Sequence, residues 1–220
     1  MPPRRTTTQQ PQIDRLTLGA LTEGDPAELR ARADLEAVGY ADLALPALDL
    51  AGGVVNEARF AGVSADETTL QGSRFVDVEL EQVNLPVVWA ARCEWRDVRV
   101  TGRLGSFEAY EAQWRSVHFV GCKISYLNLR GAELIDVAFT DCVVEELDLS
   151  GAVARRVALR GSRVGALSVQ QARLEDVDLR GCELQELSGL LDLRGATISP
   201  DQLPVLAPLM AQGLGLRVEA

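Results

Sequence analysis

The sequence has few of the residues from which most enzyme sites are built. Its 220 residues include one histidine, two methionines and 5% aromatic residues. No glycine-rich phosphate loop, GxSxG nucleophile turn or His-rich metal spacing occurs. The lone His118 directly precedes Phe119 in an outward position, where a single histidine is more often inert than catalytic. We therefore expect no catalytic residue, no cofactor and no metal, and the chain is not expected to be an enzyme.

Long hydrophobic runs and paired cysteines are also missing. No stretch approaches the roughly 20 apolar residues of a membrane span. Arg4 and Arg5 near the start are not followed by the apolar run of a secretory signal. The four cysteines form no CxxC motif, and a disulfide framework is unusual in a chain of this length. These features predict free thiols and a reducing cytoplasm.

Positive charge is scarce relative to negative charge. There are 22 Lys and Arg against 32 Asp and Glu, a formal net charge of −10. This balance disfavours direct binding to nucleic acid or to an anionic membrane, and it permits a basic protein partner. The alternative is that the acidity only keeps the protein soluble.

What the sequence does contain is a repeat of five residues. A large apolar residue recurs at Leu45, Leu50, Val55 and Phe60, and a smaller inward residue lies two positions before each later one, as at Gly53 and Ala58. A period of five fits neither a helix nor a plain strand. It fits a chain that turns a corner every five residues.

Two steps in the repeat are shortened to four residues, from Val100 to Leu104 and from Gly189 to Leu193. If both shortened steps are counted as part of one continuous repeat, the residues at small positions one coil apart are similar in size along the whole array. One such column reads Ala58, Val78, Val98, Val117, Val137, Val157, Val177 and Ala196. The chain then holds 32 central positions, which at four a coil predicts about eight coils.

Glycine recurs just before the small position on two opposite faces, as at Gly62, Gly72, Gly121 and Gly131. A turn with positive φ at that residue explains this, because glycine adopts positive φ without steric cost. The other two faces carry Asp, Glu or Ala there, so their turns are expected to differ.

The segments Leu127-Asn128-Leu129-Arg130-Gly131 and Val177-Asp178-Leu179-Arg180-Gly181 fit the motif A(D/N)LxG. In this motif, over about residues 41–198, the chain resembles the pentapeptide-repeat family, although Val or Leu often replaces Ala. The resemblance implies an all-β fold, a right-handed quadrilateral β-helix. Coils stacked at about 4.8 Å would give a rod about 38 Å long.

The flanks suggest caps, because an open solenoid end needs cover. We expect a disordered tail at residues 1–24, an N-terminal capping helix at 25–40, the solenoid at 41–198 and a C-terminal helix with a short strand at 199–220. Asp25 and Pro26 give the start signal of the first helix and Gly39 its stop. Pro208 is expected to kink or break the C-terminal helix. In gyrase-binding relatives a comparable terminal region joins two rods, which suggests a homodimer through Leu206, Leu209 and Met210.

Several side chains are candidates for the core or for a partner. Phe75, Trp95 and Trp114 take central positions on successive coils and are expected to stack in the core. Trp89 and Tyr110 take outward positions on adjacent coils and are candidate anchors for a partner. Three cysteines share one column of small positions, which favours buried structural thiols over a metal or redox ladder. They are Cys122, Cys142 and Cys182.

One outward column, two residues after the central position, is rich in carboxylates. It contains Glu57, Asp77, Asp97, Asp136 and Asp176, and we call these five residues the acidic column. Stacked carboxylates repel each other, so a column that mostly does not alternate in sign suggests use by a cationic partner. The alternative is an ordinary solvated face that nearby arginines partly neutralise.

These features favour a non-enzymatic protein-binding solenoid. Its most specific form, implied by the resemblance, is a DNA mimic that binds DNA gyrase or another topoisomerase, as in quinolone resistance. The chain lacks the long inserted loops of plasmid-borne quinolone-resistance proteins and is closer in look to the loop-free mycobacterial type. The alternative is a structural spacer or assembly module with an unknown protein partner.

Overall fold

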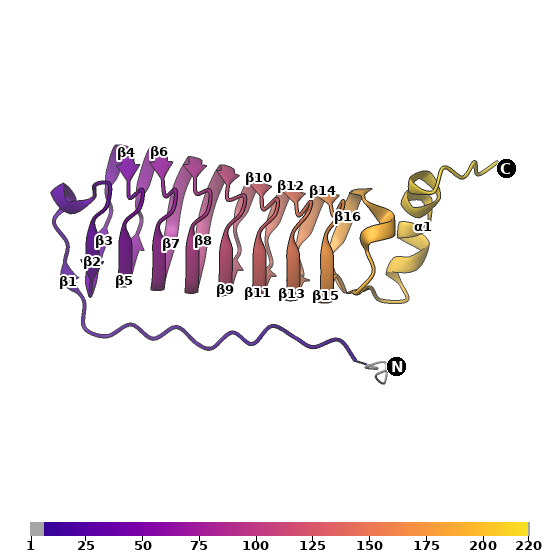
Figure 1. Cartoon of the computed structure of the whole chain (residues 1–220), viewed down its shortest axis with the longest axis horizontal. Helices are drawn as coiled ribbons and strands as arrows, with labels where there is room; N and C mark the ends of the chain where they lie inside the picture. Colours follow the sequence, from indigo (N-terminus) through magenta and orange to yellow (C-terminus); the bar gives the residue numbers. More distant parts are fainter. Residues whose placement is uncertain (1–6, 220) are drawn as a thin grey trace.

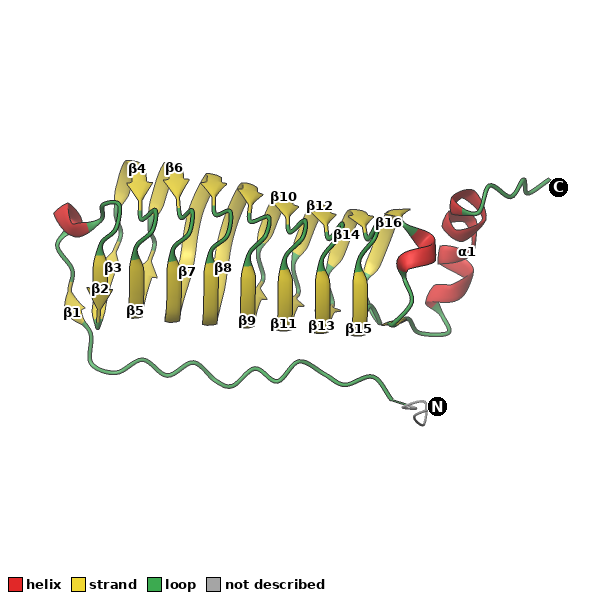
Figure 2. Cartoon of the chain, in the orientation of Figure 1, coloured by secondary structure: helices red, strands yellow, loops and turns green. Residues whose placement is uncertain are grey.

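The computed structural model describes residues 7–219, which form a β-solenoid of about nine turns followed by one C-terminal helix. Figure 1 shows the coils side by side along the long axis, with an extended N-terminal segment running beneath them. Over residues 7–219, helices lie at the two ends and none lies among the coils (Figure 2). The predicted quadrilateral β-helix is confirmed.

Seventeen strands join in one sheet that winds around the solenoid, and every pairing among the described residues is parallel. The strands are β1 (Thr22–Glu23), β2 (Asp34–Glu36), β3 (Val38–Ala41), β4 (Ala44–Asp49), β5 (Val54–Ala61), β6 (Ser64–Thr69), β7 (Arg74–Trp89), β8 (Glu94–Glu108), β9 (Gln113–Val120), β10 (Lys123–Asn128), β11 (Glu133–Thr140), β12 (Val143–Asp148), β13 (Val153–Arg160), β14 (Arg163–Ser168), β15 (Arg173–Asp178), β16 (Glu183–Ser188) and β17 (Ala196–Thr197).

The register confirms four repeats a coil and both shortened steps. Glu133 lies opposite Val153, 20 residues on, as in most coils. The separation falls to 19 where Glu94 meets Gln113 and where Val177 meets Ala196. The first shortened coil is accommodated by a register shift between Leu80 and Val83.

The core is a single apolar column inside the coils. Phe75, Trp95 and Trp114 are buried and stack as predicted, with ring centroids 5.7 Å and 5.1 Å apart along the series. Phe119 and Phe139 continue the stacking at 4.9 Å on the neighbouring face. Each large side chain therefore contacts its equivalents one coil above and below. The four cysteines are free and buried.

The predicted N-terminal capping helix over 25–40 is wrong. The helical signal yields only the 3₁₀ turn η1 (Pro26–Glu28), where Asp25 Oδ1 accepts the Ala27 N–H at 2.9 Å. The following residues form β2 and β3, whose Leu35 and Tyr40 are buried in central positions. Stacking onto β5 outweighs the local signal, because these two residues extend the five-residue period. The solenoid thus begins at about residue 34 rather than 41, which accounts for the extra length.

The tail predicted to be disordered is also corrected over the described residues. Residues 7–21, which we call the arm, run extended along the solenoid from its C-terminal coils back to β1 (Figure 1). There β1 pairs with β3, through Thr22 opposite Val38. Residues 1–6 of the predicted tail lie outside the described residues.

The C-terminal helix α1 (Gln202–Gly213) covers the last coil. The Gln202 side chain donates to the carbonyls of Leu179 and Cys182 at 2.7 and 2.8 Å, and it accepts the Ser199 N–H. One side chain therefore caps both the helix start and the open end of the solenoid. Helix α1 continues through Pro208, so the break expected there does not occur. The short strand expected after it is absent from the described residues, since 214–219 form no regular structure.

Three corners of each coil contain a residue with positive φ. These series begin with Arg32 and Gly52, with Ala37 and Glu57, and with Asp42 and Gly62. The second series includes the acidic column, so the expectation that its turn differs from the glycine turns is wrong. The fourth corner, at Ala47 and its equivalents, lies within continuous strands such as β4 and β6 and does differ.

Candidate functional site

The acidic column occupies one left-handed corner of the coils. Its five members have φ between 48° and 58°. Asp is among the residues that tolerate this conformation best after glycine, because its short polar side chain bonds locally. The frequency of Asp in the column therefore has a conformational cause in addition to any use of its charge.

The column is not the open negative stripe that was expected. Glu57 is exposed and Asp97 is half-buried, but Asp136 is 7% exposed. Asp136 receives two hydrogen bonds of 2.6 Å from Arg156, the next member of the corner. Burial raises the pKa of Asp136, but the Arg156 guanidinium and a backbone N–H outweigh it and hold the pKa below its usual value.

The arm lies over this column and donates hydrogen bonds to it. The Gln9 N–H donates to Asp176 Oδ1 at 3.1 Å, and the Gln12 N–H donates to Asp136 Oδ1 at 2.8 Å. Further along, a hollow between arm and coils is lined by Ile13–Leu16, Asp97 and His118 among others. Gly19 then lies beside Glu57. The chain's own N-terminal segment therefore bonds to Asp176 and Asp136 and passes beside Asp97 and Glu57, the last of which stays exposed.

A neighbouring carboxylate strengthens the attachment. Asp178 is buried and accepts from the Gln10 amide at 2.7 Å and from Arg180 at 2.7 and 2.8 Å. Burial alone would raise its pKa, but these donors lower the pKa of Asp178 to about 2. The group is thus held ionised where the arm crosses the coil.

His118 is not the exposed histidine that was expected. It is half-buried, and its Nε2 lies 2.9 Å from Thr140 Oγ1. Burial, followed by the nearby Arg99 charge, lowers the pKa of His118. The outward register was right, but the arm covers the position.

A second acidic surface, missed at the sequence level, surrounds the fourth corner. We define the open acidic face by the three outward columns that start at Pro46, Ala47 and Asp49 and run along β4, β6, β10, β12, β14 and β16. These columns contain eight carboxylates and no Lys or Arg, although Lys123 and Arg163 lie at the starts of β10 and β14. The carboxylates are Asp49, Asp66, Glu67, Glu108, Glu145, Glu146, Asp148 and Glu186. The sequence does carry a signal for this face: every charged residue in these columns is negative, just as the residues in each inward column share a size. In Figure 1 these strands lie at the upper edge of the coils, away from the arm.

The two candidate aromatic anchors separate in the structure. Trp89 is 40% exposed, lies on the open acidic face and donates from Nε1 to Glu67 at 3.2 Å. In the neighbouring coil, the residue opposite Trp89 is Glu108, and Tyr110 comes two residues after Glu108. Trp89 and Tyr110 therefore do not lie in the same column and do not stack. Tyr110 is half-buried beside the turn. Partner binding by either residue stays a prediction.

The proposed dimer residues mostly face the chain's own last coil. Leu206 is 4% exposed and belongs to the core, and Leu209 and Met210 pack partly against it. Leu206 as a dimer contact is therefore wrong, because it already has a partner. The apolar side chains left exposed are Leu203, Val205, Leu214, Leu216 and Val218.

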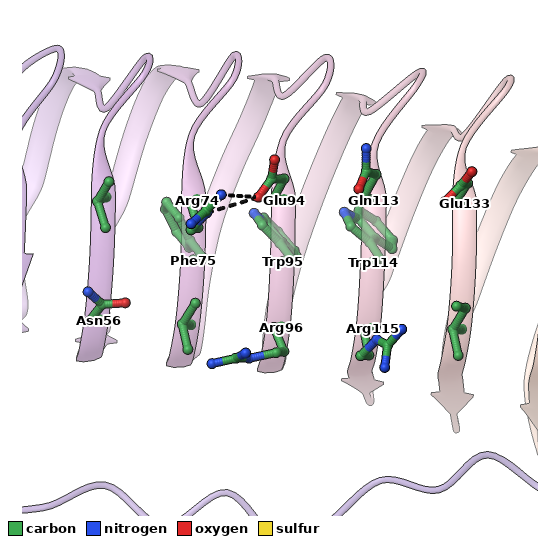
Figure 3. A pocket seen from close by; sticks show the side chains of 13 residues that line it. Asn56, Arg74, Phe75, Glu94, Trp95, Arg96, Gln113, Trp114, Arg115 and Glu133 are labelled. Carbon is green, nitrogen blue, oxygen red and sulfur yellow. Dashed lines mark hydrogen bonds and ion pairs between the residues drawn. The ribbon is translucent and has the colours of Figure 1, made fainter.

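The face outside the tryptophan stack carries mixed charge (Figure 3). Arg74 pairs with Glu94 at 2.8 Å, Arg96 follows two residues after Glu94 on β8, and Arg115 lies in the equivalent position on β9. Within residues 7–219, no cluster of His, Cys, Asp or Glu could hold a metal ion, and no helix is long and apolar enough to cross a membrane. The arrangement offers charged surfaces rather than an enclosed site.

Residues 112–188 match the family model described as a pentapeptide repeat region. No curated protein has a significantly similar sequence. Among solved structures, a trypsin-treated form of the plasmid-mediated fluoroquinolone resistance protein QnrB1 is similar at 16% identity, over 85% of this chain and 92% of that chain, with a TM-score of 0.33. HetL, a pentapeptide-repeat protein involved in heterocyst differentiation regulation in a Nostoc cyanobacterium, is similar at 15% identity, over 75% and 89%, with a TM-score of 0.21.

Proposed function

We propose that this chain, which contains a pentapeptide-repeat region at residues 112–188, is a non-enzymatic protein-binding solenoid of the cytoplasm. Its partner is a protein with a cationic surface, and its most specific form is a DNA mimic that binds DNA gyrase or another topoisomerase. The observation that carries the proposal is the open acidic face, with eight carboxylates in three columns and no Lys or Arg among them.

The charge of that face suits a partner built for an anionic ligand such as DNA. Its nearest carboxylates within one column, such as Glu146 and Glu186, are two coils apart, at about 9.6 Å, so the face offers net negative charge rather than a copy of the phosphate spacing. Glu145, Glu146 and Glu186 are exposed, and no ion pair of theirs occurs within residues 7–219. Their charge is therefore free to attract a cationic groove and raise the rate of encounter. Trp89 at the same face supplies an apolar anchor.

The acidic column remains a second candidate contact for the partner, but the arm lies over it. Glu57, Asp77 and Asp97 keep some exposure, whereas Asp136 is buried and paired. We rank the open acidic face first because six of its eight carboxylates are exposed without any rearrangement, while Asp148 is buried and lies 3.7 Å from Arg130.

A homodimer through the C-terminal segment is part of the proposal. The contacts are the apolar side chains that α1 and the following residues leave exposed, chiefly Leu203, Val205, Leu214 and Leu216. Such a cluster is unusual at the end of a monomeric chain. Two rods joined at this end would double the length of the acidic surface.

The test is a DNA gyrase supercoiling assay with two matched sets of substitutions. The first set, Glu145→Gln, Glu146→Gln and Glu186→Gln, removes three charges from the open acidic face. The second set, Glu94→Gln, Glu133→Gln and Glu175→Gln, makes the same change in net charge on the face outside the tryptophan stack, where Figure 3 labels Glu94 and Glu133. We expect the parent and the second set to inhibit or protect gyrase and the first set to lose that effect.

An additional variant, Asp77→Asn with Asp97→Asn, tests the acidic column. If only this variant loses the effect, the partner binds at the column rather than at the open face. If the parent neither inhibits nor protects gyrase, the topoisomerase proposal fails and a spacer or assembly role takes its place.

A further inference from the structure

The arm and the acidic column match in spacing. Three residues of extended chain span about 10 Å, and two stacked coils span about 9.6 Å. Gln9 meets Asp176, Gln12 meets Asp136 two coils away, and Arg15 shares a hollow with Asp97 two coils farther on. Every third residue of the arm therefore reaches the corner of every second coil, and at each of these coils the corner residue is a carboxylate.

On the coils between these contacts, the residue at the same corner is mostly not a carboxylate. Arg156 and Ser116 occupy the coils that the arm passes over, while Asp77 is the one intermediate carboxylate. Arg156 bonds to Asp136 and orients it toward the arm. Between Asp97 and Asp176, carboxylates and other residues thus alternate from coil to coil. The contacts with the arm explain this order better than charge repulsion between carboxylates does.

The arm is attached without contributing to the core. None of residues 7–21 is buried, whereas the buried apolar residues begin at Leu35. The side chains that face the coils are only half-buried, as Ile13, Leu16 and Leu18 are. Release of the arm would therefore expose little apolar surface, and the coils keep all their internal pairing.

From this geometry we propose that the acidic column is a recognition track for an extended peptide, and that the arm is its tethered, exchangeable ligand. The ligand class is a chain segment that presents backbone N–H groups at three-residue intervals to carboxylates on alternate coils. This inference does not depend on the proposed function. Its consequence is that Asp136 and Asp176 are closed to other partners until the arm leaves.

The test uses the full chain and a fluorescent synthetic peptide with the sequence of residues 7–21. In the arm variant, Gln9→Pro with Gln12→Pro, both N–H donors are removed while the extended conformation is kept. We expect the peptide to bind this variant, and to bind the parent at least about tenfold more weakly because the tethered arm occupies the track at high effective concentration.

Two further substitutions in the arm variant locate the binding. Asp176→Asn keeps the left-handed corner and an acceptor oxygen but removes the charge, so it should weaken peptide binding by about tenfold. Asp77→Asn, in the same column but outside the three-residue period, should leave peptide binding unchanged. Equal effects of the two substitutions would overturn the proposed register.

Trypsin cleavage after Arg15 reports whether the tethered arm has left the track, and cleavage after the exposed Arg217 serves as the internal reference. We expect faster cleavage after Arg15 in the arm variant and no change after Arg217. If cleavage shows that the arm has been released and the peptide still does not bind, the track is not a peptide site and the proposal is wrong. Because this assay contains no gyrase, its outcome is separate from that of the proposed function.

Discussion

A single residue in this fold is under the same constraint as its equivalents in the coils above and below. At inward positions the constraint is volume, because each large side chain stacks on the next, as Trp95 does between Phe75 and Trp114. At three corners the constraint is conformation, because φ is positive there. A substitution is therefore felt according to its place in the coil rather than its place along the chain.

Trp95→Ala should lower the free energy of unfolding by about 3–5 kcal/mol, because it leaves a cavity between two stacked aromatic rings. Gln113→Ala, at an exposed position directly before Trp114, should change it by less than about 0.5 kcal/mol. Urea unfolding followed by circular dichroism measures both. Equal costs would contradict the inward and outward register.

Stability should fall as the pH drops from about 4 to about 2. The pKa of Asp178 is about 2 in the folded chain and about 3.9 in an unfolded one, so the unfolded chain takes up the proton first. Stability from this group is therefore complete above about pH 4 and is lost as the pH falls through the folded pKa, by on the order of 2 kcal/mol. Unfolding curves at several pH values should show a smaller loss in Asp178→Asn, and an unchanged loss would contradict this assignment.

At the scale of elements, the coils could be predicted from the sequence and the arm could not. The period of five, with columns of equal size at 20 residues, located Trp95, the two shortened steps and the inward cysteines, because each repeat places the same position inside. The contact from Gln12 to Asp136 joins residues 124 apart, and nothing periodic marks the arm. The Asp25-Pro26 signal was real but fixed only one turn, since Leu35 and Tyr40 gain more by stacking on Val55 and Phe60.

The first shortened coil depends on Gly102. Its φ is 128°, and an added Cβ would lie 2.1 Å from the Val83 carbonyl oxygen. Gly102→Ala should therefore cost well over the roughly 1–2 kcal/mol expected for a left-handed corner alone. Gly121→Ala, at φ 59° with no atom near the added Cβ, is the matched control and should cost about that smaller amount. Thermal unfolding of both variants decides, and equal melting temperatures would contradict the account of the shortened coil.

At the scale of the whole molecule, two sides of the rod differ in what covers them. The arm lies along one corner of the coils, while the open acidic face at the fourth corner keeps six of its eight carboxylates exposed. Five exposed large apolar side chains are gathered at the C-terminal end, beyond the last coil, whereas Trp89, Val143 and Val153 are exposed singly along the coils. Charge along one side and apolar surface at one end suit a rod that pairs end to end and presents its length to a partner.

Val205→Glu with Leu216→Glu should convert a dimer to a monomer, because both side chains are over 60% exposed and a buried unpaired carboxylate in an interface is costly. Light scattering gives the mass directly. Leu206 is left intact in this variant because it caps the coils. A full-length protein that is already monomeric at high concentration would contradict the dimer.

The most direct test of the central claim, that the open acidic face binds a cationic protein, is the affinity for purified DNA gyrase measured over a series of salt concentrations. The account predicts that affinity falls steeply with salt. The slope should become shallower for Glu145→Gln with Glu146→Gln and Glu186→Gln, and stay the same for Glu94→Gln with Glu133→Gln and Glu175→Gln. Equal slopes for the parent and both variants, or no binding at low salt, would contradict it.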